Sequence, residues 1–324
     1  MLKALIVGNA IDSSGILEKV RLEFETTEVT HEFFQRNKLT LLPAHDLIWI
    51  HVETVLGKED RSLLKNNVII STTSTGYTHI AKEIVDFLGE RLITLKGEEG
   101  LLGEITSTAE LTWMLILIGA TKGNLAIERV KAGDWDRKAN IRDKQISSMK
   151  VGILGFGRLG KMVSQYARAF GSTVYVWDID SSAREQAMNA GFHVVSDIKE
   201  LFILSDLVSV HVNTFPGSSP IITSALLENS RKGLVLVNTS RGSIVDEADI
   251  IESIKSGVLT MYLTDVLKFE EEEAGELENS LLWKFSVNDL RIVITPHIGG
   301  ASRDAMHLCE ENILERVKKA IHKA

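Results

Sequence analysis

The chain has 324 residues, of which 44% are hydrophobic and 25% charged, and its formal net charge is −8. This length favours two domains of about 150 residues each, and the negative balance attracts neither nucleic acid nor an anionic membrane. A single cysteine, Cys309, excludes an intrachain disulfide, and the apolar runs are too short for a secretory signal or a membrane span. We therefore expect a cytoplasmic protein with no nucleic-acid or membrane partner.

Short apolar runs alternate with amphipathic stretches along the first hundred residues. The stretches 15–24 and 79–90 are typical of helices, and four apolar runs are typical of buried strands: 4–8, 47–52, 68–71 and 92–95. This alternation predicts an α/β protein with parallel strands covered by helices on both faces. A second series of strands is predicted at 150–157, 173–178, 207–212, 233–238, 261–266 and 291–296.

An unusually apolar helix is predicted between the two series. Ser107 and Glu110 have capping-box spacing, which marks a helix start, and residues 111–120 are apolar on most sides. Such a helix must be buried on most sides. A partner subunit would supply surface that one domain lacks, so we expect a homodimer.

The second series opens with the pattern Gly155-Phe-Gly157-Arg-Leu-Gly160 between an apolar strand and a helical stretch. The next strand ends in Asp178, eighteen residues after the third glycine. This context is the dinucleotide fingerprint, in which the glycines permit a tight turn and close approach of the pyrophosphate. Asp178 can accept hydrogen bonds from an unmodified ribose and repels a 2′-phosphate. The sequence therefore predicts NAD rather than NADP.

Three later strands end in residues that can do chemistry. Arg241 follows the strand at 233–238, Asp265 and Glu270 follow the next strand, and His297 follows the last. Ligands bind beyond the carboxyl ends of strands in open parallel sheets, so these side chains are expected around one crevice. Asp246 is predicted to cap the helix that follows Arg241.

That set of residues suits hydride transfer to a 2-keto acid. An arginine can bind the carboxylate through two hydrogen bonds, and a histidine can protonate the carbonyl oxygen near neutral pH. A glutamate paired with the histidine favours the imidazolium and orients the ring. We therefore predict that Arg241, Glu270 and His297 act together.

The chain resembles the D-isomer-specific 2-hydroxyacid dehydrogenase family through the motifs GILGFGRLG, NTSRGSIVDE, TDV and TPHIGG, which occur in the family's order. The resemblance implies an NAD-dependent oxidoreductase that transfers a hydride between nicotinamide and C2 of a small 2-keto or 2-hydroxy acid. Arg241 would bind the substrate carboxylate, His297 would be the general acid and base, and Glu270 its partner. Asp265 would contact the nicotinamide end of NAD, and no metal is expected.

The resemblance also implies two Rossmann-like, doubly wound parallel-sheet domains with a cleft between them. Residues 1–101 and 299–324 would form the substrate domain, and residues 102–298 the NAD-binding domain, through which two copies would dimerise. Other residues are also predicted to line the cofactor site: Phe156, Arg158, Leu159, Thr108, His211, Thr239 and Ser240.

Two alternatives stay open, one for the catalytic glutamate and one for the function. The family usually has Glu-Pro at the catalytic glutamate, whereas Glu270 is followed by three more glutamates, so Glu271 is a rival. Glu270 is preferred because it lies five residues after Asp265, which is the family spacing. The alternative function is an NAD(H)-sensing binding protein on the same fold, like the family's transcriptional corepressors.

The substrate is predicted to meet the first domain at two loops. The resemblance implies that backbone N–H groups of Thr75 and Gly76 meet the substrate carboxylate. Relatives that act on 3-phosphoglycerate typically carry Arg-Ser-Arg-Thr where this chain has His51-Val52-Glu53-Thr54. His51 is predicted to contact substrate, but it cannot replace a two-pronged arginine, and Glu53 repels a phosphate. We expect a neutral or amine-bearing 2-keto acid rather than 3-phosphohydroxypyruvate.

Overall fold

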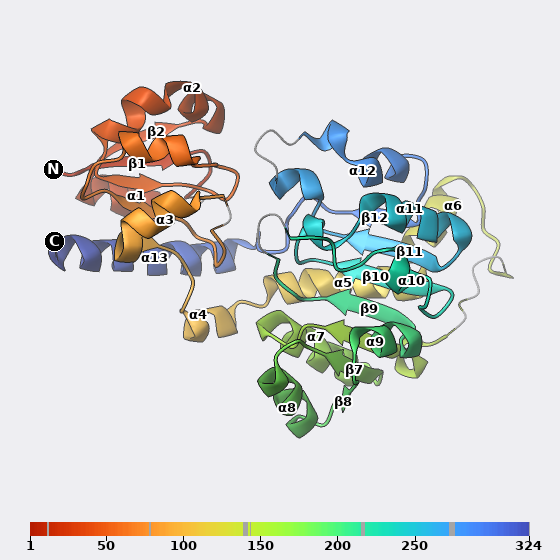
Figure 1. Ribbon diagram of the computed structural model, residues 1–324. Coiled ribbons are helices and arrows are strands. Elements are labelled where there is room, and N and C mark those ends of the chain that lie inside the picture. Colours follow the sequence, from red (N-terminus) through yellow and green to blue (C-terminus); the bar gives the residue numbers. More distant parts are fainter. Residues whose placement is uncertain are drawn as a thin grey trace. The chain divides into compact units, whose positions relative to one another are not determined.

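The computed structural model describes residues 1–11, 13–77, 79–138, 142, 144–214, 218–271 and 276–323. The chain forms two compact units (Figure 1). The first unit comprises Met1–Ile105 and Gly300–Ala324, and the second comprises Thr106–Gly299.

The first unit contains a five-stranded parallel sheet in the order β2-β1-β3-β4-β5. Its strands are β1 (Lys3–Val7), β2 (Glu25–Val29), β3 (Leu47–Trp49), β4 (Ile69–Ser71) and β5 (Leu92–Ile93). Its helices are α1 (Ser14–Glu23), α2 (His31–Leu41), α3 (Lys82–Leu88), α4 (Glu99–Glu104) and α13 (Arg303–Lys323). One hydrophobic cluster joins α1 and α13 to one face of the sheet, and a second joins α2 and α3 to the other face.

The second unit contains a seven-stranded parallel sheet in the order β12-β11-β10-β9-β6-β7-β8. Its strands are β6 (Lys150–Leu154), β7 (Thr173–Trp177), β8 (His193–Val194), β9 (Leu207–Val210), β10 (Leu234–Asn238), β11 (Leu259–Thr264) and β12 (Ile292–Ile294). Its helices are α5 (Ser107–Thr121), α6 (Gly123–Lys131), α7 (Arg158–Ala169), α8 (Ser181–Asn189), α9 (Ile198–Leu204), α10 (Ser224–Leu227), α11 (Glu247–Ser256) and α12 (Leu281–Ser286).

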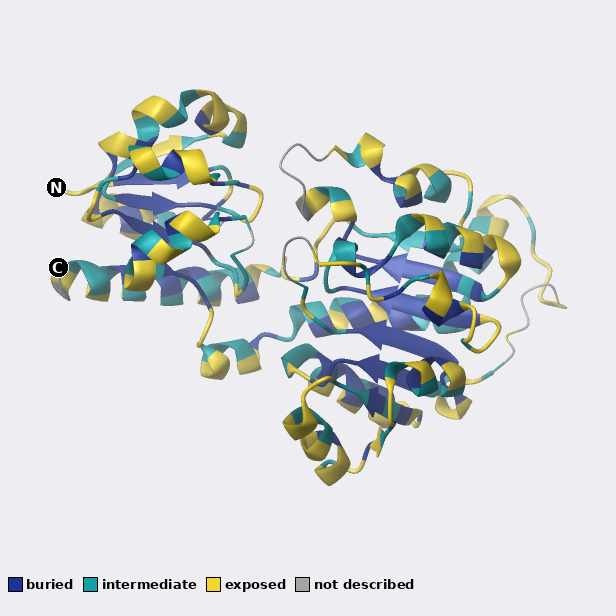
Figure 2. Ribbon diagram, viewed as in Figure 1, coloured by how far each residue is buried: buried dark blue, intermediate teal, exposed yellow. Residues whose placement is uncertain are grey.

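Both faces of the second sheet are covered, and alternate side chains of its strands enter two different cores. Leu234 and Leu236 of β10 pack with α9, α10, α11 and α12, whereas Val235 and Val237 pack with α5, α7 and α8. The central strands are buried while the helices keep exposed outer faces (Figure 2). The predicted α/β class, with two parallel sheets wound by helices on both faces, is confirmed.

The predicted apolar helix is α5, which is a core helix of the second unit. Residues Glu99–Thr121 have the length and hydropathy of a membrane span, but α4 and α5 within this range are separate helices. Leu115 and Ile116 are buried, and Gly119 lets α5 approach the sheet so closely that an added Cβ would lie 2.6 Å from Val235 Cγ1. The composition of α5 therefore reflects its packing against β10 and β11.

The predicted capping box at the start of α5 is wrong. Thr106 is the N-cap residue, and its hydroxyl donates to Glu110 Oε1 at 2.6 Å. The buried Ser107 hydroxyl has no hydrogen-bond partner among the described residues. The spacing therefore correctly indicates that a helix starts here, but the N-cap residue is Thr106 and not Ser107. The predicted cap of α11 is confirmed, because Asp246 accepts from the N–H groups of Ala248 and Asp249.

Candidate active site

The glycine-rich loop after β6 leaves open space at the start of α7. Gly155 has φ +95°, and a Cβ there would lie 2.5 Å from the His211 carbonyl oxygen. A Cβ on Gly160 would lie 2.0 Å from the Gly155 carbonyl oxygen, so only glycine allows α7 to start here. Gly157, the N-cap residue, has no neighbour within 4 Å of an added Cβ among the described residues, and as a glycine it offers no capping side chain. A helix N-terminus beside an open space fits a pyrophosphate.

Asp178 follows β7 and faces the same loop. Its Oδ2 accepts from the Phe156 N–H at 2.6 Å, and its Oδ1 accepts from the Asp180 N–H at 2.9 Å. Each carboxylate oxygen can accept more than one hydrogen bond. Asp178 is therefore held in place and can still accept bonds from a ribose.

His211 lies after β9, directly against the glycine-rich loop. Its Nε2 lies 2.9 Å from the Ser209 hydroxyl, and its enclosed Nδ1 has no partner among the described residues. Burial lowers the pKa of His211 to about 3, so the ring is neutral. His211 consequently adds no positive charge beside the expected pyrophosphate.

The turn after β10 carries Arg241 toward the loop after β11. Arg241 Nη1 donates to the Ser240 carbonyl at 2.7 Å, and Ser240 Oγ donates to the Val210 carbonyl at 2.7 Å. Gly242 follows, and a Cβ at this position would lie 2.1 Å from the carbonyl carbon of Leu267. This contact between main chains brings the arginine turn against the short helical turn η7 (Lys268–Glu271).

The turn after β12 is fixed by Asp265, which is only 2% exposed. Its Oδ1 accepts from the Thr295 hydroxyl at 2.5 Å and from the Ile298 N–H at 2.9 Å. Its Oδ2 accepts from the Gly299 N–H at 2.8 Å. Within the described residues this leaves a lone pair of Oδ2 for the nicotinamide contact that the sequence predicts.

His297 sits inside this turn with φ +52°, a conformation that is uncommon for a residue with a side chain. Such backbone strain costs on the order of 1–3 kcal/mol and persists only where the surroundings enforce it. The hydrogen bonds from both flanks of His297 to Asp265 supply that enforcement. These bonds thereby fix the backbone that carries the imidazole.

Glu270 and His297 are in direct contact, because His297 Nδ1 hydrogen-bonds Glu270 Oε2. The other oxygen, Glu270 Oε1, accepts from the Leu267 N–H at 2.6 Å, so the carboxylate cannot rotate freely. The hydrogen bond with Glu270 raises the pKa of His297 against the opposing effect of burial, and the nearby positive charge of Arg241 lowers it. The three predicted residues therefore lie within electrostatic reach of one another.

For most of the other predicted cofactor residues, the structure shows side-chain contacts within the second unit. Phe156 is buried against Phe192, and Leu159 packs against the hydrophobic core. The Thr239 hydroxyl lies 2.7 Å from the Thr112 hydroxyl of α5. Thr108 lies beside the histidine turn, since a Cβ added to Gly299 would be 3.1 Å from Thr108 Cγ2. Arg158 is the first residue of α7, directly after the glycine-rich loop.

The first unit carries the remaining predicted residues at the carboxyl edge of its own sheet. Thr75 and Gly76 follow β4, and their N–H groups donate to no acceptor within the described residues. The Ser74 hydroxyl donates to the Gly76 carbonyl at 2.5 Å and shapes this loop. His51 follows β3, with Nδ1 3.9 Å from Glu53 Oε2. Free amides in a shaped loop suit a carboxylate.

Several residues that shape the site were not predicted as functional. Asn238, Gly242 and Thr295 tie the turns together through the contacts described above and through hydrogen bonds of the Asn238 amide. All three stand within the motifs already noted, at most three residues from Arg241 or His297. The signal that could have identified them is the turn chemistry of asparagine and glycine at strand ends.

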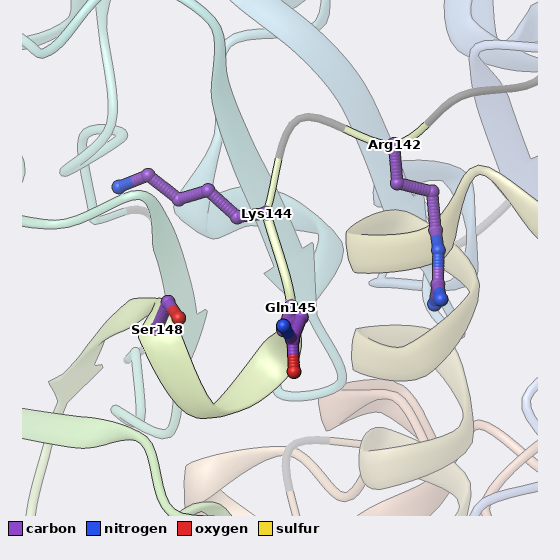
Figure 3. A pocket seen from close by; sticks show the side chains of 4 residues that line it. All are labelled: Arg142, Lys144, Gln145 and Ser148. Atoms are coloured by element: carbon purple, nitrogen blue, oxygen red, sulfur yellow. The ribbon is translucent and has the colours of Figure 1, made fainter.

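A separate surface pocket is lined by two positively charged residues whose side chains do not point toward a common centre (Figure 3). It is lined by Arg142, Lys144, Gln145 and Ser148, and the side chains of Arg142 and Lys144 point in different directions (Figure 3). Lys144 Nζ lies 2.9 Å from both oxygens of Asp206, which neutralises its charge. We assign this pocket no role.

Taken together, the cofactor loop and the Glu270–His297 pair define a dinucleotide-binding α/β protein with an acid–base group at the same sheet edge. Residues 113–299 match the family model described as "D-isomer specific 2-hydroxyacid dehydrogenase, NAD binding domain". The chain belongs to this family, as its motifs predict, and the predicted cofactor NAD is confirmed.

Curated relatives are dehydrogenases and reductases. The chain is 32% identical over 215 residues to D-3-phosphoglycerate dehydrogenase of Methanocaldococcus jannaschii, an alignment covering 66% of this chain and 39% of that protein. The chain thus spans about two fifths of that relative's length. It is 26% identical over 298 residues to the hydroxypyruvate reductase of Thermotoga maritima, which covers 92% of both proteins.

Solved structures share the whole fold. A glyoxylate reductase from Paecilomyes thermophila superposes with a TM-score of 0.80 and 24% identity, over 99% of this chain and 96% of that one. The D-lactate dehydrogenase of Aquifex aeolicus, solved with NAD and lactic acid, gives a TM-score of 0.79 and 20% identity over the same shares. These likenesses confirm the two-domain fold.

Asp178 is predicted to select NADH over NADPH. Replacing Asp178 with alanine should weaken NADH binding and relax the preference, because ribose contacts and repulsion of the 2′-phosphate are both lost. Fluorescence titration of both cofactors measures this change. Asp180→Ala is the matched control, since that carboxylate caps α8 and accepts from the Ser182 N–H. Equal affinity of the unmutated protein for NADH and NADPH would contradict the assignment.

Proposed function

We propose that this protein is an NAD-dependent oxidoreductase that interconverts a small 2-keto acid and the D-2-hydroxy acid. The observation that carries the proposal is the Glu270–His297 pair beside Arg241, at the same sheet edge as the cofactor loop. An arginine, a histidine whose pKa is raised by its carboxylate partner, and that fixed carboxylate match the needs of a substrate with a carboxylate next to a carbonyl.

In the proposed reduction, Arg241 binds the substrate carboxylate and orients the neighbouring carbonyl. Reduced nicotinamide, when bound, supplies the hydride that C2 receives. His297 donates its proton to the carbonyl oxygen as that oxygen gains negative charge, which yields the hydroxy acid and a neutral imidazole. Glu270 stabilises the imidazolium before transfer and keeps Nδ1 occupied, so that Nε2 faces the substrate. In the oxidative direction His297 accepts the proton instead.

His297 and Glu270 are predicted to have separable effects. Replacing His297 with alanine should lower reduction about 10²–10⁴-fold without changing NADH affinity, because general acid catalysis is lost. Glu270→Gln removes the hydrogen bond that raises the pKa of His297. Reduction needs the protonated ring and fails as pH rises through that pKa, so the alkaline limb of kcat/KM should move to lower pH.

Steady-state rates across pH, with NADH affinity measured in parallel, test both changes. Glu271→Gln is the control for Glu270→Gln, since the sequence alone left these two residues as rivals. A silent Glu270→Gln change would refute the assignment. Tight NADH binding with no turnover of any 2-keto acid would instead favour an NAD(H)-sensing protein.

The first unit supports a preference among substrates. The N–H groups of Thr75 and Gly76, which donate to no acceptor in the described part of the chain, suit a carboxylate. Glu53, whose side chain is 78% exposed at the neighbouring strand end, repels a phosphate dianion. We therefore predict that 3-phosphohydroxypyruvate is reduced less efficiently than pyruvate, hydroxypyruvate or glyoxylate. NADH oxidation on this panel measures the order. Better turnover of the phosphorylated acid would contradict it, and Glu53→Gln should raise its relative rate if repulsion is the cause.

A homodimer through the second unit is supported by apolar side chains on α6. Ile127 is 58% exposed and Val130 50% exposed, and together with Ala126 they line a shallow hollow on the helix. Ile127→Glu with Val130→Glu should convert a dimer into monomers, because four charges would be buried across a symmetric contact. Light scattering after gel filtration measures the mass. A monomeric wild type at micromolar concentration would contradict the proposal.

A further inference from the structure

Asn238 ends β10 and is fully buried, yet its side chain has a partner for each polar atom. Its Nδ2 donates to the Arg241 carbonyl at 2.9 Å and to the Tyr262 hydroxyl at 3.4 Å. Its Oδ1 accepts from the Ser240 N–H at 3.0 Å. The bonds to Ser240 and Arg241 fold residues 238–241 into a tight turn.

The main chain of Asn238 makes a second set of contacts, with the neighbouring strand end. Its carbonyl oxygen accepts from the Asp265 N–H at 3.1 Å and from the Thr264 hydroxyl at 2.9 Å. Asp265 in turn holds the turn that contains His297. One buried residue therefore connects the arginine turn with the histidine turn.

We propose that Asn238 is a positioning residue that sets the spacing between Arg241 and His297. The inference rests on the proposed function, in which those two groups act on adjacent atoms of one substrate. The carboxylate and the neighbouring carbonyl of the substrate have a fixed spacing. If the turn that carries Arg241 shifts relative to the turn that carries His297, the two side chains cannot contact both groups at once. Misplacement by about 1 Å can cost about 10²-fold in rate.

The chemistry at this position requires a donor and an acceptor in one planar group. Aspartate has the same shape but presents an unprotonated oxygen to the Arg241 carbonyl, where two acceptors repel each other. A protonated aspartic acid can donate there again, so the loss should be reversed as pH falls. Tyr262 stays a neutral hydroxyl throughout, since burial raises its pKa to about 12.

The kinetic test compares Asn238→Asp with Asn124→Asp. Asn124 lies in the same unit and donates to the Leu290 carbonyl at 2.7 Å, away from the arginine turn. For Asn238→Asp we expect kcat/KM for the 2-keto acid to fall at least about tenfold at neutral pH with unchanged NADH affinity. The ratio of variant to wild type should rise as pH falls, and Asn124→Asp should match wild type. A loss that is independent of pH, or shared by Asn124→Asp, would overturn the proposal.

A second measurement does not depend on turnover. Asn238→Ala removes the acceptor of the Ser240 N–H, so hydrogen exchange at that amide should be at least about tenfold faster than in wild type and in Asn124→Ala. Unchanged exchange would overturn the proposal even in an active enzyme. If wild type reduces no 2-keto acid, the proposed function fails while the exchange result still decides whether Asn238 holds the turn.

Tyr262→Phe covers the case in which variants of Asn238 do not fold. It keeps the buried ring and removes one partner of the Asn238 amide. We expect about a threefold or larger loss in kcat/KM for the 2-keto acid, with NADH affinity unchanged. A Tyr262→Phe variant with wild-type kcat/KM would then overturn the proposal.

Discussion

The buried carboxylate of Asp265 is the constraint on which the candidate site depends. A buried charge is stable only where hydrogen-bond donors surround it, and here the donors come from both sides of His297. Satisfying that carboxylate forces the turn into one shape and holds His297 at positive φ. The hydrogen bonds that a buried aspartate requires thus offset the strain on the histidine, and the turn becomes a fixed support for the imidazole.

The sheet brings this support to the cofactor. In the order β12-β11-β10-β9-β6-β7-β8, successive strands are added on one side from β6 to β8 and on the other side from β9 to β12. The loops that follow β6 and β9 therefore lead away from each other at the boundary between these two strands. Ligands in open α/β sheets bind at such a switch point. The glycine-rich loop follows β6, and Arg241, Glu270 and His297 follow β10, β11 and β12 on the same side of the sheet. The glycine-rich loop and the proposed acid–base residues therefore share one edge, because all strands of this sheet are parallel.

This edge of the sheet could be predicted from the sequence because apolar runs mark the strands and the residues that follow each run lie at its carboxyl end. Continuous apolar runs located the central strands. They did not reveal the edge strand β2, because Glu25–Val29 is mostly polar, or the edge strand β8, because His193–Val194 begins with an exposed histidine and is not fully buried. Strand-end logic placed Arg241, Glu270 and His297 together. It could not reveal that the Thr239 hydroxyl pairs with Thr112, or that Asn238 joins two turns. Such choices depend on where turns bring atoms, which no spacing pattern records.

We propose that Arg241 and His297 act on adjacent groups of one 2-keto acid. A crystal structure with NADH and oxamate, an unreactive analogue of pyruvate, tests this most directly. We expect the oxamate carboxylate to bind the Arg241 guanidinium and its carbonyl oxygen to lie within hydrogen-bond distance of His297, while Glu270 keeps its hydrogen bond to His297 Nδ1. Oxamate bound away from both side chains, or with its carboxylate on His297, would contradict it.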